Sequence, residues 1–264
     1  MSLILKPISS MNKCFMDESI DDKKQITRAK ALRGEEFAFE IAYADPECIT
    51  FAKNTYYLRV NSPLAEHITV RHIEQVPVRL PCYDSVDDYY LRKTPGMYPD
   101  LLGPIDPTGL VIITGGELKS LLVTVYIPED AEAGEYPVGI SFMNNDGSEA
   151  ASAEITLKIV AATLPKQEMI VTEWFHTDCI ADYYELPVFS EKHWEYIENF
   201  METAVKNGIN TILMPVFTPP LDTAVGGERT TVQLVDGEKT DCGWKFGFDR
   251  LERWVETARR VGVE

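Results

Sequence analysis

Residues Thr211–Gln233 read TILMPVFTPPLDTAVGGERTTVQ, and this stretch decides the fold of the second half of the chain. The nearly continuous apolar run over 211–217 predicts a buried strand. Pro219 and Pro220 end that strand, because proline cannot donate a hydrogen bond to a sheet ladder. A loop with charged side chains and a pair of glycines, Gly226 and Gly227, follows. Since α/β proteins bind ligands beyond the carboxyl ends of their strands, the stretch predicts one wall of a ligand site.

The surrounding sequence alternates between strand and helix patterns. Residues 169–175 predict an earlier strand, and an apolar stripe at helical spacing follows Ser190. A second helical stripe follows Asp249. This order of strand, helix, strand, helix indicates parallel βα units. A closed eight-stranded barrel takes about 250 residues, so the two units found here amount to an incomplete (β/α)8 barrel.

Local signals predict where these helices begin and end. Ser190 is a good N-cap, and Phe189 before it is spaced from Trp194 as in a hydrophobic staple. Asp249 is expected to cap the second helix, which Gly262 ends in the left-handed conformation.

The first part of the chain carries a different, β-only pattern. Short runs that alternate between apolar and polar residues recur between turn signals, and Asn144–Gly147 predicts a hairpin turn. We expect seven or eight short strands in an antiparallel β-sandwich over 26–164, after a lead-in segment at 1–25. Residues 165–264 are expected to form the partial barrel. A long segment rich in proline and tyrosine, 81–107, predicts a loop whose tyrosines stack on a sugar or fill a domain interface.

Composition excludes several functions. The 264 residues carry a net charge of -17 without a basic cluster, which argues against nucleic-acid binding and against docking on an anionic membrane. Five cysteines are scattered without a CxxC pair, so neither a disulfide framework nor a zinc ribbon is predicted. The chain lacks a signal-peptide pattern and a membrane-spanning run. We therefore expect a cytoplasmic protein without a cofactor.

Several longer motifs resemble glycoside hydrolase family 123. In the second half these are WFHTDC at 174–179, FSEKHW at 189–194, NGINTIL at 207–213 and FTPPLDTAVGGERTTVQLV at 217–235. In the first half, PGMYPDLL at 95–102 and VTVYIPEDAEAGEYPVGI at 123–140 are similar to the N-terminal β-sandwich of this family.

The resemblance implies a β-sandwich followed by a (β/α)8 barrel that hydrolyses β-linked N-acetylhexosaminides, typically N-acetylgalactosaminides. The implied mechanism is retaining and substrate-assisted, so the acetamido oxygen of the sugar, rather than an enzyme carboxylate, attacks the anomeric carbon. In the family, an Asp-Glu pair on a middle barrel strand orients the acetamido group and supplies the general acid. Since no residue here matches that pair, the catalytic residues are expected beyond Glu264, and this chain alone is expected to be inactive.

Five residues are candidates for substrate binding. His176 and Asp178 follow the first predicted barrel strand, and Asp222 and Arg229 lie in the loop after the second. Trp244, in a glycine-rich return loop, is the candidate for stacking on a sugar. Two of these residues also have a purely structural explanation: His176 is then held by hydrogen bonds within its loop, and Arg229 is paired with a loop carboxylate such as Glu228.

Two other functions remain open at this stage. The chain fits a non-catalytic carbohydrate-binding or structural β-sandwich module, and His176 with Asp178 also hints at a metal-dependent hydrolase, although two ligands fall short of a zinc site. A two-stranded barrel fragment would expose an apolar edge, so we also expect self-association or a homo-oligomer.

Overall fold

The structure is a computed structural model that describes residues 3–48, 53–82, 85, 89–217 and 223–263. The chain divides into two compact units, Met1–Pro165 and Lys166–Glu264. Each unit is described by itself.

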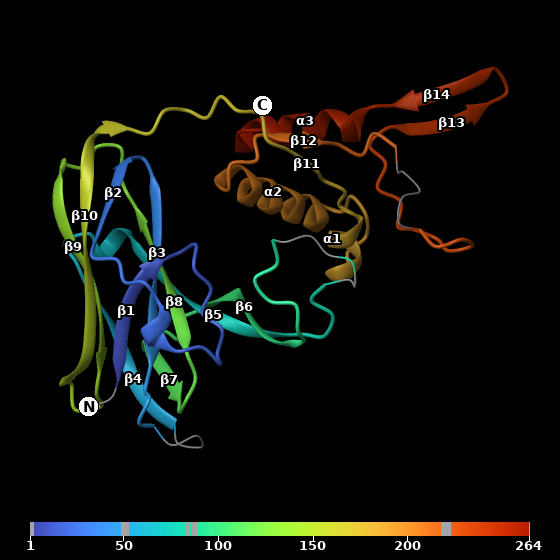
Figure 1. Cartoon of the computed structure of the whole chain (residues 1–264). Helices are drawn as coiled ribbons and strands as arrows, with labels where there is room; N and C mark the ends of the chain where they lie inside the picture. Colours follow the sequence, from blue (N-terminus) through green and yellow to red (C-terminus); the bar gives the residue numbers. More distant parts are fainter. Residues whose placement is uncertain (1–2, 49–52, 83–84, 86–88, 218–222, 264) are drawn as a thin grey trace. The chain divides into compact units, whose positions relative to one another are not determined.

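The first unit is a β-sandwich of two five-stranded sheets (Figure 1). The strand order is β1-β3-β8-β5-β6 in the first sheet and β2-β10-β9-β4-β7 in the second. The strands are β1 (Ile4–Ser9), β2 (Arg28–Arg33), β3 (Glu36–Ala44), β4 (Lys53–Asn61), β5 (Ile68–Val78), β6 (Gly96–Pro104), β7 (Leu110–Thr114), β8 (Lys119–Tyr126), β9 (Gly134–Met143) and β10 (Glu149–Thr163). Two short 3-10 helices cover Ile20–Asp22 and Ala65–His67.

The sandwich core forms because alternate residues of facing strands are apolar. Phe39 and Ile41 of β3 and Leu121 and Val123 of β8 are fully buried against residues such as Phe142 of β9. Within this interior Phe142 packs against two tyrosines, edge-on to Tyr43 and stacked on Tyr56. The predicted hairpin across Asn144–Gly147 is confirmed, since β9 pairs antiparallel with β10.

The sandwich departs from the sequence expectation in three respects. The described residues of 26–164 contain nine strands rather than seven or eight, and the predicted lead-in segment adds a tenth, β1, to the first sheet. The sheets are not wholly antiparallel, because the long β10 also pairs in parallel with β2 at the edge of the second sheet. The segment 81–107 is not a loop throughout, since Gly96–Pro104 is strand β6, paired with β5. The prolines misled the prediction because they are tolerated in β6, which is an edge strand.

The second unit mixes short strands with helices. Its elements are β11 (Thr172–Trp174), α1 (Asp178–Tyr183), α2 (Glu191–Lys206), β12 (Thr211–Leu213), β13 (Asp236–Thr240), β14 (Gly243–Gly247) and α3 (Asp249–Val261). β11 and β12 pair in parallel, and β13 with β14 forms a separate antiparallel hairpin. A core around Trp194 of α2 and Trp254 of α3 packs against Ile212 and Met214.

The strands of this unit are shorter than the predicted 169–175 and 211–217. Pro215 has no N–H and limits β12 on one side. Before β11, the side chain of Asn210 takes the place of a ladder: it accepts from the Val171 N–H at 2.9 Å and donates to the Met169 carbonyl at 3.0 Å. The segment between β11 and α2, for which no helix is predicted from the sequence, contains the short helix α1.

Most helix ends are as predicted. Ser190 Oγ accepts from the His193 N–H at 3.3 Å, and the rings of Phe189 and Trp194 stack 5.3 Å apart. Gly262 ends α3 with φ 101°. The predicted cap at Asp249 is wrong: Phe248 is the N-cap without a side-chain hydrogen bond. Asp249 lies in the first turn instead, where its charge still favours the positive end of the helix dipole.

None of the helices in the described part of the chain has the length and apolar character that a bilayer crossing requires.

Candidate functional site

The candidate site lies where the chain leaves the carboxyl ends of the parallel strands β11 and β12. β11 is followed by Phe175, whose N–H donates to the Leu213 carbonyl at 3.3 Å, and then by His176, Thr177 and α1. The chain that leaves β12 returns through 223–230. A cavity of about 440 Å³ is lined by α1 and this returning loop, namely by Asp178, Asp182, Thr223, Ala224, Gly227, Glu228, Arg229 and Thr230.

An ion pair joins the two segments. Arg229 Nε donates to Asp178 Oδ2 at 2.5 Å, although the two residues are 51 positions apart. The side chain of Asp178 is 11% exposed and that of Arg229 is 24% exposed. Burial alone would raise the pKa of Asp178, but the hydrogen bond and charge of Arg229 outweigh it, so the pKa is held below its ordinary value. Asp178 is therefore an ionised acceptor at neutral pH.

A second hydrogen bond joins α1 to the same returning loop. Thr230 is the residue directly after Arg229, and its Oγ1 donates to Asp182 Oδ1 at 2.6 Å. Asp178 and Asp182 are four residues apart and thus share one face of α1. Each of these two carboxylates consequently holds one residue of the returning loop.

A buried histidine fixes the segment that carries Asp178. His193, in the first turn of α2, is fully buried. Its Nδ1 accepts from the Phe189 N–H at 2.9 Å, so its Nε2 carries the proton and donates to the Thr177 carbonyl at 3.0 Å. Burial lowers the pKa of His193, although the Thr177 hydrogen bond opposes this, and the neutral ring suits both contacts. His193 therefore acts as a positioning residue for the start of α1.

The structure brings together only some of the predicted site residues. Asp178 and Arg229 meet in the cavity, and Arg229 pairs with Asp178 rather than with its neighbour Glu228. His176 is half-buried beside the exposed Trp174, with ring centroids 6.3 Å apart, and does not line the cavity. Asp222 lies outside the described residues.

Trp244 is placed differently from the prediction. It lies in strand β14 of a regular hairpin, opposite Lys239, rather than in a glycine-rich loop. Its side chain is 63% exposed, so an aromatic face is still presented to solvent. The pairing of β14 with β13, after a turn in which Gly243 has φ 132°, sets its position.

Three residues of the site were missed from the sequence: Asp182, Thr230 and His193. The spacing of Asp178 and Asp182 is a usable signal, but it has meaning only on a helix, and no helix is predicted between residues 175 and 190. No local pattern marks His193, because its partners are a backbone carbonyl and a backbone N–H brought close by the turn into α2.

A metal centre finds no support in the described residues, where no group of three or more His, Cys, Asp or Glu side chains is arranged to hold an ion. His176 and Asp178 therefore lack a third ligand among the residues that the structure covers.

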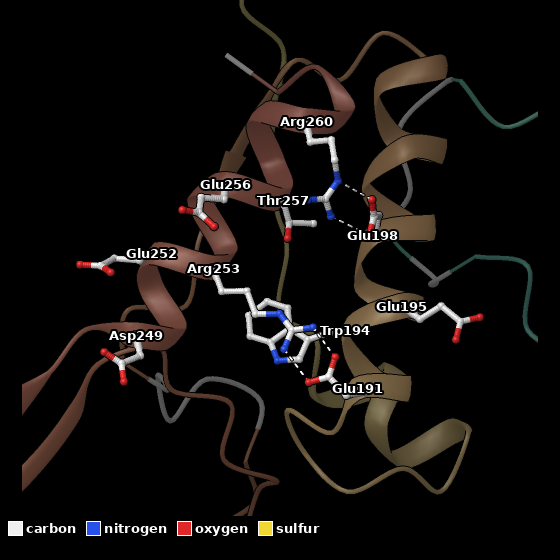
Figure 2. Close-up of a pocket in the computed structure, with 10 residues that line it drawn as sticks. All are labelled: Glu191, Trp194, Glu195, Glu198, Asp249, Glu252, Arg253, Glu256, Thr257 and Arg260. Atoms are coloured by element: carbon white, nitrogen blue, oxygen red, sulfur yellow. Dashed lines mark hydrogen bonds and ion pairs between the residues drawn. The ribbon is translucent and has the colours of Figure 1, made fainter.

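A larger cavity, of about 610 Å³, lies between α2 and α3 (Figure 2). Its two arginines are already engaged: Arg253 reaches across the ring of Trp194 to make a bidentate pair with Glu191, and Arg260 pairs with Glu198. Figure 2 shows both pairs bridging the helices, while Asp249, Glu252 and Glu256 point away from these pairs. This groove is held together by its own ion pairs and contains no residue from the ends of β11 or β12.

Comparison with known proteins places the second unit in a family context. Residues 174–264 match the family model described as the catalytic domain of glycoside hydrolase 123. The resemblance inferred from the motifs is thereby confirmed over these residues. A comparison with curated proteins gave no match.

Among solved structures, the chain is similar to a family 123 glycoside hydrolase from Clostridium perfringens, studied for glycolipid glycan hydrolysis, with 14% identity and a TM-score of 0.74. The similarity covers 99% of this chain and 46% of that enzyme, so the chain spans less than half of its length. At this identity the likeness shows the fold, a β-rich unit of antiparallel sheets joined to a unit with few helices.

Other similarities are much weaker. AvmM, which catalyses macrocyclization in alchivemycin A biosynthesis, has a TM-score of 0.32 and 12% identity over 64% of this chain and 93% of its own. A DUF4466 family protein from Parabacteroides merdae has a TM-score of 0.32 and 15% identity over 60% and 44%. Neither carries an argument about function.

Proposed function

We propose that this chain is the N-terminal portion of a glycoside hydrolase that cleaves β-linked N-acetylhexosaminides, with N-acetylgalactosaminides as the expected substrates. In this proposal, residues 26–164 form the accessory sandwich and 165–264 the opening part of a (β/α)8 barrel, with β11 and β12 as its first two strands. The reaction is retaining and substrate-assisted, and the Asp-Glu pair that serves it belongs to later strands of the barrel.

One observation carries the proposal: the family match covers 174–264, and within this segment charged side chains meet beyond the carboxyl ends of two parallel strands. Barrel enzymes build their active sites on this side of the sheet. The cavity of about 440 Å³ falls within the volume range of small-molecule sites, and together with the ionised Asp178 it supports the assignment of this region to substrate binding.

The proposed roles follow from the chemistry of each side chain. Asp178 accepts hydrogen bonds from sugar hydroxyls, and Arg229 holds its carboxylate in place. His176, which lies beside the exposed ring of Trp174, donates a hydrogen bond to a sugar hydroxyl or accepts one from it. Trp244 offers a flat apolar face to the sugar ring, and Asp222 is kept as a hydroxyl acceptor on the strength of the sequence alone.

The test is hydrolysis of a chromogenic β-N-acetylgalactosaminide by the full-length protein that contains this chain. Activity should fall when the N-acetyl group is replaced by N-trifluoroacetyl, because the weakened acetamido oxygen is the proposed nucleophile. Arg229→Lys should lower kcat/KM roughly tenfold, since lysine cannot reproduce the planar guanidinium contact. Arg253→Lys is the matched control, because that arginine is paired with Glu191 on the helices and should leave kcat/KM unchanged.

The outcomes separate the parts of the proposal. Cleavage of other hexosaminides but not galactosaminides would change the sugar and keep the enzyme class. Equal rates for the acetyl and trifluoroacetyl substrates would remove the substrate-assisted mechanism. Absence of any hexosaminidase activity in the full-length protein would favour the alternative, a non-catalytic carbohydrate-binding or structural module.

A further inference from the structure

A third cavity lies within the β-sandwich, and none of its residues has a role in the proposed reaction. It has a volume of about 540 Å³, within the range of small-ligand sites, and residues of both sheets line it. β6 ends the first sheet and β7 ends the second, and both contribute to the wall, through Met97 and Ile112 respectively. The cavity is therefore an opening between the two sheets beside their edge strands.

The inner wall of the cavity is formed by residues of three neighbouring strands of the first sheet, β3, β8 and β5. Tyr43 of β3 and Lys119 of β8 are directly paired. His72 of β5 pairs with Leu121, which lies two residues after Lys119 in β8. All three have the same alternation as buried core residues of their strands, so they face the interior. Side chains on paired strands are held more rigidly than side chains on loops, as a binding site requires.

Two polar side chains in this wall lack partners. Tyr43 is 2% exposed, with its ring edge-on to Phe142, yet its hydroxyl makes no hydrogen bond to any described residue. His72 is half-buried and likewise makes no hydrogen bond within the described part of the chain. Neither the Tyr43 hydroxyl nor a His72 ring nitrogen is among the fully buried side-chain atoms without a partner, so both groups are open to the cavity and can form hydrogen bonds with water or with a ligand that enters it.

The charges around the cavity narrow the kind of ligand. Glu117 is paired with Lys119 at 2.9 Å, and the carboxylate of Asp106 accepts hydrogen bonds from Thr108. With Glu74, the lining carries three carboxylates against the single ammonium group of Lys119, which disfavours an anionic ligand. Burial also lowers the pKa of His72, against the opposing charge of Glu74, so the ring is neutral at pH 7 and has one donor and one acceptor.

The outer part of the lining is apolar and exposed, since Ile112 alternates along β7 with the core residues Val111 and Ile113 and therefore lies on the outer side of that strand. Ile112 is 45% exposed and Met97 is 39% exposed. A ligand that fits both the inner and the outer part of this lining presents hydroxyl groups, which donate and accept hydrogen bonds, to the first and C–H groups to the second. Sugar rings have this character, whereas an aromatic hydrocarbon would leave Tyr43 and His72 unpaired.

We propose that this opening of the sandwich, with Tyr43, His72 and Lys119 on its inner wall and Ile112 and Met97 at its outer rim, is a non-catalytic sugar-binding site. The site itself is inferred from these residues, and only the choice of N-acetylgalactosamine as the first probe rests on the proposed function.

The experiment is a titration of the 264-residue chain with N-acetylgalactosamine, N-acetylglucosamine and galactose, followed by NMR of labelled isoleucine and methionine methyl groups. The Ile112 and Met97 methyls report on this cavity, whereas those of Ile212 and Met214 report on the core of the second unit. Saturable shifts at Ile112 and Met97 are expected for at least one sugar. Shifts confined to Ile212 and Met214, or no saturable shift with any of the three sugars, would overturn the proposal.

The variant Tyr43→Phe should weaken this binding about fivefold, because it removes one hydrogen bond and little else. Tyr56→Phe is the matched control: Tyr56 also packs on Phe142 but does not line the cavity, so its loss of a hydroxyl should leave the affinity unchanged. Lys119→Gln gives a second test at the same wall. Unchanged affinity in Tyr43→Phe and Lys119→Gln would mean that water fills the cavity and satisfies the hydroxyl, which contradicts the proposal. Because hexosaminidase activity is measured separately, failure here leaves the proposed function standing, and the reverse also holds.

Discussion

Glu40 makes the stability of the sandwich depend on pH in an unusual direction. It lies in β3, is 4% exposed, and its Oε2 is buried without a hydrogen-bond partner among the described residues. Burial raises its pKa from 4.5 to about 7, against the lowering effects of the Ser120 hydroxyl and of the Lys13 and Lys23 charges. Above pH 7 the sandwich therefore has to bury an ionised carboxylate.

The sign and the magnitude follow from proton linkage. Between the unfolded and the folded pKa, the folded state binds the proton more tightly, so stability falls as pH rises from 4.5 to about 7 and then levels off. At about 1.4 kcal/mol for each pKa unit, the loss is on the order of 3 kcal/mol. Glu40→Gln keeps the shape and removes the charge, so this part of the pH dependence should disappear in the variant.

The assay is urea unfolding of wild type and Glu40→Gln at pH 5 and pH 8. Far-UV circular dichroism follows the strands, while tryptophan fluorescence follows only the second unit, because all four tryptophans lie at positions 174–254. The control is Glu36→Gln, an exposed glutamate on the same strand. Relative to wild type, Glu40→Gln should gain about 3 kcal/mol between pH 5 and pH 8 and Glu36→Gln should not. An equal pH dependence in Glu40→Gln and wild type would refute the reasoning.

Three further predictions concern the second unit. His193→Phe should destabilise it by about 2–4 kcal/mol, because the Phe189 N–H and the Thr177 carbonyl lose their buried partner, whereas the exposed change Lys192→Ala should cost far less; urea unfolding followed by tryptophan fluorescence measures both. Asp178→Asn should lower the free energy of unfolding by about 1–2 kcal/mol at pH 7, since it removes the charge that pairs with Arg229. The difference from wild type should vanish as pH falls through the lowered pKa of Asp178, because the wild-type carboxylate is then protonated as well. A difference that persists at low pH would exclude the ion pair as its cause. Trp174, Leu213 and Phe217 are 63%, 49% and 60% exposed beside the short strands, so the isolated chain should self-associate and bind a hydrophobic dye; sedimentation showing a monomer without dye binding would contradict the partial-barrel proposal.

The candidate site shows how far sequence reasoning reaches. The loop after β12 and the segment after β11 were both expected at the binding face, because the βα pattern alone implies which strand ends carry ligands. That Asp178 rather than Glu228 takes Arg229 could not be read from the chain, since the nearest carboxylate in sequence is not the nearest in space. The reach of an arginine side chain depends on the path of the loop, which no local pattern specifies.

The sequence by itself determined the features that depend on neighbours a few residues apart. The Ser190 cap, the Phe189–Trp194 contact, the left-handed Gly262 and the β9–β10 hairpin each follow from backbone preferences and side-chain reach within one or two turns. Only the tertiary structure decided the parallel pairing of β2 with β10 and the unpartnered Tyr43 hydroxyl between the sheets. These depend on which distant strands meet, and the free energy of those encounters comes from burial shared by the whole core rather than from any single stretch of the chain.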